Sequence, residues 1–112
     1  MILPIVQELS VFGLVDRGVP NQERIILRPT ELVNLMQFVV TIALREEGGM
    51  VRPLNDHIFW FPELIVAPPS WILLYTGPGT PRETIISESN QPAYTLHWGK
   101  PNTILKDRKS VV

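Results

Sequence analysis

The chain has 112 residues, of which 45% are apolar and 19% are charged, and its formal net charge is −1. This length suits a single domain spanning 1–112, and the composition excludes a disordered chain. The small net charge argues against a surface built to attract nucleic acid or an anionic membrane, and the lack of cysteine excludes disulfides, thiolate nucleophiles and cysteine-ligated zinc.

We expect no secretory signal in the first residues. They lack a basic region followed by a long apolar stretch, and Pro4 interrupts them. The charge-free apolar segment 32–44 contains Asn34, Gln37 and Thr41, which makes it too polar and too short to cross a bilayer. We therefore expect no membrane partner, and we expect a cytoplasmic location, which the lack of cysteine also fits.

Eleven prolines and seven glycines punctuate the chain, which is typical of short strands joined by turns. The clearest predicted strand is Trp71–Thr76, because Pro68 and Pro69 precede it and Gly77–Pro81 follows it. In chain order, the predicted strands cover residues 6–15, 23–28, 56–61, 71–76, 84–87, 94–98 and 103–112.

Residues 30–47 carry two periodicities. As a helix at about 31–47, the segment would be capped by Thr30 and ended by Gly48, and the fold would be α+β. As a strand, Gln37–Arg45 alternates between two faces and is rich in β-branched residues, which pack well on pleated surfaces. We favour the strand because its neighbours on both sides are also predicted strands, and the fold class is then all-β.

Several short patterns follow one another from residue 23 onward. They are Glu23–Arg28, Val33–Leu35 with Phe38, the turn at Gly48–Gly49, Phe59–Pro62, Leu64–Pro69 and Trp71–Gly77. This order resembles the lamin-tail type of immunoglobulin-like domain, whose closing strands would correspond to 94–98 and 103–112. The resemblance implies an antiparallel immunoglobulin-like β-sandwich that acts as a non-catalytic interaction module, and it transfers no catalytic residue.

Aromatic side chains are the candidate binding residues, and they are Trp60, Trp71, Tyr75, Tyr94 and Trp98. Strand alternation places Trp71 and Tyr75 on one face. Since one face of each strand must be core, the opposite aromatics are either covered by loops or free to bind a partner. We predict a contact surface formed by Trp60, Trp71 and Tyr75.

The basic segment Lys100–Lys109 could hold phosphates, with Tyr94 and Trp98 as stacking platforms. We prefer to explain these residues as a solvated edge strand whose lysines prevent aggregation. Nucleic acid is therefore an improbable partner. His57 and His97 lack the spacing of a metal site. We therefore expect no metal, no cofactor and no catalytic residue.

Three hypotheses about function follow. The first is a non-enzymatic module that binds a protein or a second copy of itself. The second is a β-sandwich that binds carbohydrate or another small molecule. The third is a small hydrolase in which Asp56, His57 and His97 converge in one cleft.

Overall fold

The computed structural model describes residues 8–45, 47–105 and 110–111. Almost all regular structure in these residues is extended. The two short helical elements are η1 (Leu35–Gln37), a 3-10 turn, and η2 (Glu47–Gly49), which is irregular because Gly48 has a positive φ of 80°. The strands are β1 (Leu9–Val15), β2 (Arg24–Pro29), β3 (Val33–Asn34), β4 (Val39–Arg45), β5 (Val51–Trp60), β6 (Ile65–Val66), β7 (Trp71–Tyr75), β8 (Arg82–Ile86), β9 (Gln91–His97) and β10 (Ser110–Val111).

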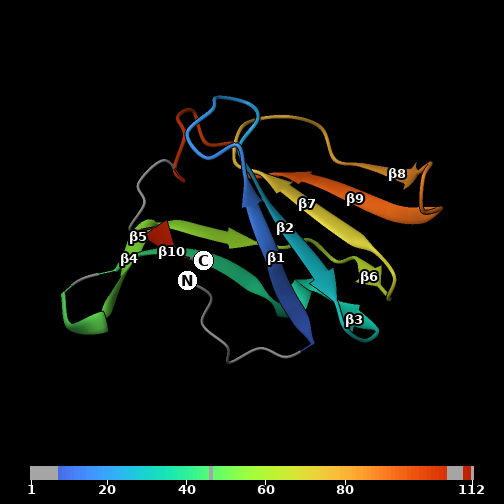
Figure 1. Ribbon diagram of the computed structural model, residues 1–112, viewed down its shortest axis with the longest axis horizontal. Coiled ribbons are helices and arrows are strands. Elements are labelled where there is room, and N and C mark those ends of the chain that lie inside the picture. The colour runs from blue at the N-terminus through green and yellow to red at the C-terminus, as the bar shows by residue number, and fades with distance from the viewer. Residues whose placement is uncertain (1–7, 46, 106–109, 112) are drawn as a thin grey trace.

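These strands form a five-stranded sheet in the order β1-β2-β7-β9-β8, a three-stranded sheet β10-β4-β5 and a small pair β3-β6. Figure 1 shows the five-stranded sheet packed across β4 and β5, which confirms the predicted all-β sandwich. The expectation of purely antiparallel pairing needs one correction, because β7 and β9 are parallel. The chain passes from β7 to β8 at the sheet edge. The β8–β9 hairpin then places β9 between β7 and β8.

The α+β alternative with a helix at about 31–47 is wrong. This segment forms β3, η1 and β4. The side-chain oxygen of Asn34 accepts hydrogen bonds from the amides of Met36 (3.2 Å) and Leu64 (3.3 Å), which fixes the single turn η1 against the neighbouring loop. After this turn, β4 buries Val40 and Ile42 in the core, so tertiary packing decides between the two periodicities.

The core lies between the inner faces of the two larger sheets. Ile25 and Leu27 of β2 and Ile72 and Leu74 of β7 are buried on every second residue, as strand alternation requires. The core also includes Leu9, Val33, Leu35, Val40, Ile42, Phe61, Val66, Leu96 and Leu105.

The predicted strand 103–112 is only partly confirmed. Residues 103–105 are not a strand, residues 106–109 lie outside the described residues, and β10 contains only Ser110 and Val111. The buried carboxylate of Glu23 accepts hydrogen bonds from the amides of Ile104 (2.7 Å) and Leu105 (3.1 Å), so these amides are engaged by a side chain instead of a strand partner.

Candidate functional site

The outer face of the five-stranded sheet begins with β7. Ile72 and Leu74 point into the core and are fully buried, so Trp71, Leu73 and Tyr75 point to the opposite side. These three side chains are half-buried, which leaves aromatic surface open to a partner on this side of the sheet.

At one end of this face, three side chains contact the Trp71 indole, and they are Arg28, Phe12 and Gln91. The Arg28 guanidinium carbon lies 3.8 Å from the ring centroid, and Phe12 contacts the ring edge-on at a centroid distance of 5.0 Å. The indole Nε1–H donates to Gln91 Oε1 at 2.7 Å, and Arg28 Nε donates to the Ser70 carbonyl at 3.3 Å. These contacts hold the arginine and the indole in a fixed stack before any partner binds.

Phe12 reaches this site because β1 is irregular there. The pairing of β1 with β2 shifts between Val11 and Gly13, which is a β-bulge at Phe12. The bulge turns the ring toward Trp71, yet 62% of the Phe12 side chain surface stays exposed. An apolar ring of this size in contact with solvent is available to a partner.

A second stack lies at the other end of the face. The Arg24 guanidinium carbon is 5.4 Å from the Tyr75 ring centroid, and its Nη1 forms an ion pair with Asp16 Oδ2 at 2.9 Å. The Tyr75 ring stacks on the His97 imidazole, with centroids 5.4 Å apart and planes at 22°. An arginine, a phenol and an imidazole therefore lie side by side across β2, β7 and β9.

The loop after β7 covers His97. A Cβ atom added at Gly79 would lie 2.3 Å from the imidazole Cε1, so no other residue fits at position 79 without moving the ring. Among the described residues, the buried Nδ1 of His97 has no hydrogen-bond partner. The loop therefore holds the imidazole in place by steric contact with Gly79.

The outer face carries more positive than negative charge. Arg82 of β8 is paired with Thr95, which is paired with Leu73, so strand register places Arg82 on the same face. Within the described part of the chain, neither Arg28 nor Arg82 forms an ion pair, whereas Arg24 is neutralised by Asp16. We define the arginine–aromatic face by its side chains, which are Phe12, Arg24, Arg28, Trp71, Tyr75, Arg82 and His97.

The structure brings together two of the three residues predicted to form one contact surface. Trp71 and Tyr75 share the arginine–aromatic face, whereas Trp60 lies on the outer face of the other sheet. Trp60 is 73% exposed there and is paired with Val39, while the pair Thr41 and Ile58 lies beside it.

The remaining two predicted aromatics lie on the inner side. Tyr94 is paired with the buried Ile72, so its ring faces inward and packs against the core. Trp98 contacts Phe59 at a centroid distance of 5.6 Å, and the Lys100 ammonium lies 6.0 Å from its ring. The predicted grip on phosphate by the basic segment falls largely on 106–109, which lie outside the described residues.

The two histidines belong to different sheets, since His57 lies on β5 and His97 stacks on Tyr75 in the five-stranded sheet. The Asp56 side chain lies outside the described part of the structure. No group of three or more side chains that could hold a metal ion occurs within the described residues.

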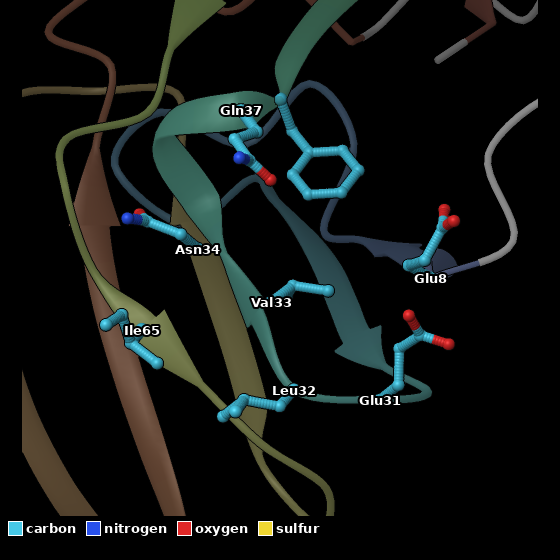
Figure 2. Close-up of a pocket in the computed structure, with 8 residues that line it drawn as sticks. Glu8, Glu31, Leu32, Val33, Asn34, Gln37 and Ile65 are labelled. Carbon is cyan, nitrogen blue, oxygen red and sulfur yellow. The ribbon is translucent and has the colours of Figure 1, made fainter.

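A hollow of about 490 Å³ lies beside β3 and η1, and Figure 2 shows Glu8 and Glu31 on the same side of it. The Asn34 oxygen at this hollow is already engaged by two backbone amides. Two carboxylates alone do not define a cation site. We therefore place the candidate site on the arginine–aromatic face.

Sequence reasoning found Trp71 and Tyr75 but missed Phe12, Arg24, Arg28 and Arg82. The sequence does indicate Arg24 and Arg28, because Arg24, Ile26 and Arg28 alternate with apolar residues and so share the outer face of β2. The positions of Phe12 and Arg82 depend on strand pairing, for which the sequence contains no local signal. Phe12 lies at a bulge in the pairing of β1 with β2, and Arg82 is placed on the outer face by the pairing of β8 with β9.

Comparisons with protein-family models, curated proteins and solved structures found no match. In the described part of the chain, none of the helices has the length and apolar character needed to cross a membrane.

Proposed function

We propose that the protein is a non-catalytic interaction module that binds an acidic segment of a partner protein on its arginine–aromatic face. The observation that carries the proposal is the preformed stack of Arg28 on Trp71 at 3.8 Å. An arginine held over an indole keeps its outward N–H groups available for a carboxylate, and little side-chain entropy is lost on binding.

The charges of the face favour an acidic partner. Arg28 and Arg82 carry positive charge that no acidic side chain neutralises among the described residues. The exposed Phe12 ring and the half-buried Tyr75 add apolar contact area beside these charges. Arginine and aromatic residues are the side chains that most often dominate the binding energy of protein interfaces.

The same geometry disfavours sugar and unpaired bases as the ligand. Both bind by stacking on a free aromatic face, whereas Arg28 already covers one face of Trp71 and Phe12 packs against the indole in a T-shaped contact. Nucleic acid also requires a larger basic surface than two unpaired arginines provide, and the formal net charge is −1.

We also propose that the chain is a lamin-tail-type immunoglobulin-like domain, and the all-β sandwich supports this proposal. Domains of this type are non-catalytic appendages, which agrees with a role as an interaction module. A cytoplasmic location is likewise proposed, with the lack of cysteine as its support.

A direct test measures binding of a dye-labelled synthetic peptide in which glutamate and tyrosine alternate, by fluorescence anisotropy at low and high salt. We expect Arg82→Gln to weaken binding about two- to fivefold, because that is the size of one exposed charge pair. Arg28→Gln is expected to weaken it more, and Arg28→Lys to an intermediate degree, because lysine keeps the charge but loses the planar stack.

The matched control is Arg52→Gln, which changes an exposed arginine on β5 of the other sheet. This variant should bind the peptide as the unmodified protein does. Equal loss in Arg52→Gln and Arg28→Gln would contradict the proposal, and so would a single-stranded oligonucleotide that binds more tightly than the acidic peptide.

A further inference from the structure

The sheet edges of the protein differ in how they are protected against pairing with another strand. At β1, a bulge at Phe12 breaks the regular ladder. β5 contains Pro53, which has no backbone N–H to donate, and its pairing with β4 shifts between Thr41 and Ala43. By contrast, β8 pairs with β9 in unbroken register and contains neither proline nor lysine.

The β8 edge is also accessible. Residues 82–85 are all exposed, and Ile85 presents 57% of its surface to solvent. Figure 1 shows β8 at the margin of the molecule, on the opposite side from β4, β5 and β10. The outward N–H and C=O groups of this strand have no neighbouring strand in the described structure.

A shallow hollow of about 260 Å³ lies at the start of β8, and Pro62, Leu64, Tyr94 and Leu96 contribute apolar surface to it. Glu83 faces this inner side, because it is paired with the inward-facing Tyr94. A strand added beside β8 would place every second side chain on the same inner side, next to Glu83.

The hollow carries two carboxylates, Glu63 and Glu83. Within the described residues neither forms an ion pair, and Arg82, whose strand register places it on the outer face, also lines the hollow. An arginine or lysine side chain suits such a place, because its methylene stem covers apolar surface while its charged end reaches the carboxylates.

We propose that β8 captures an extended basic segment of a partner protein, which adds as a further strand and places an arginine or lysine beside Glu83 and Glu63. Backbone hydrogen bonds to β8 supply affinity, and the two carboxylates supply specificity. This site adjoins the arginine–aromatic face at Arg82 but uses the strand edge and the two carboxylates, so it does not depend on the function proposed above.

The charge of Glu83 also disfavours one pairing of β8 with a second copy of the chain. In a two-fold pairing of β8 centred on Glu83, the two carboxylates would lie directly opposite each other, and like charges in this position are destabilising. A basic residue at the same position forms an opposite-charge pair, so the feature that disfavours this self-pairing favours the proposed partner.

The test uses a synthetic peptide in which arginine and threonine alternate, with a matched peptide that carries glutamate in place of arginine. We expect the arginine peptide to bind, and to slow hydrogen exchange at those backbone amides of 82–86 that point away from β9. A version with N-methylated backbone amides should not bind, because it cannot pair with the strand. Glu83→Gln should weaken binding about two- to fivefold, the size expected of one cross-strand charge pair.

The sharper variant is Glu83→Lys, which should bind the glutamate peptide in preference to the arginine peptide. Because Glu83 is exposed, this change leaves the core intact. The control is Glu31→Lys, which changes an exposed carboxylate outside this hollow and should keep the preference for the arginine peptide.

Three outcomes would overturn the proposal. In the first, the arginine peptide leaves the outward β8 amides unprotected, and in the second, the N-methylated peptide binds equally well. The third is protection of these amides without peptide, through dimerisation of the protein.

Discussion

Glu23 is a charged residue that the protein buries almost completely, with 1% of its surface exposed. Its Oε1 accepts hydrogen bonds from the amides of Gly18 (3.0 Å) and Leu105 (3.1 Å), and its Oε2 accepts from Ile104 N (2.7 Å) and the Thr76 hydroxyl. One carboxylate thus joins three segments that are far apart in the sequence. The sequence predicts only that Glu23 begins a strand, because three of its four donors come from segments more than 50 residues away.

We expect Glu23→Gln to lower the free energy of unfolding by roughly 2–4 kcal/mol, because the amide nitrogen places a donor against other donors and leaves buried groups unpaired. Denaturant unfolding monitored by circular dichroism measures this loss. Glu31→Gln is the control, since its side chain is exposed, and it should change stability by less than about 0.5 kcal/mol. Equal stability of the two variants would show that the Glu23 network contributes nothing.

Gly79 offers a second test at the scale of a single residue. We expect Gly79→Ala to destabilise the fold by about 1–3 kcal/mol, because the new Cβ would lie 2.3 Å from the His97 ring. Thermal unfolding of Gly79→Ala, His97→Ala and the double variant separates the causes. If steric overlap is the reason, Gly79→Ala costs nearly nothing in the His97→Ala background. A full, additive cost in the double variant would contradict this explanation.

At the scale of the element, β4 shows where sequence patterns suffice and where they fail. The alternation in Gln37–Arg45 indicated a strand correctly, whereas the preceding residues were ambiguous because their turn depends on Asn34 bonding to the distant Leu64 amide. Thr41 is paired with Ile58, which faces outward and is 41% exposed, whereas Ile42, the next residue of β4, points into the core and is fully buried.

The two isoleucines therefore form a matched pair for measurement. Ile42→Ala should cost about 2–5 kcal/mol of stability, because it leaves a cavity between the sheets. Ile58→Ala removes the same atoms from an exposed position and should cost far less. Urea unfolding of both variants decides the matter, and a cost for Ile58→Ala equal to that of Ile42→Ala would mean that the sandwich faces are assigned incorrectly.

At the scale of the whole molecule, local patterns predicted most strands and the all-β class, because alternation and turn residues are local properties. Strand order is not local. The parallel neighbours β7 and β9 and the separation of Trp60 from Trp71 onto different sheets follow from pairing between distant segments. The candidate site was therefore only half predictable, since Trp71 and Tyr75 share one strand while their arginine partners come from another.

The most direct test of the proposed binding face is a map of backbone amide chemical shifts, recorded while the acidic glutamate–tyrosine peptide is added to the nitrogen-15-labelled protein. We expect the largest changes at 24–28 and 71–75 and at the Trp71 indole N–H, which now donates to Gln91. Changes confined to β4 and β5 around Trp60, or no changes at saturating peptide, would contradict the assignment of the arginine–aromatic face as the binding site.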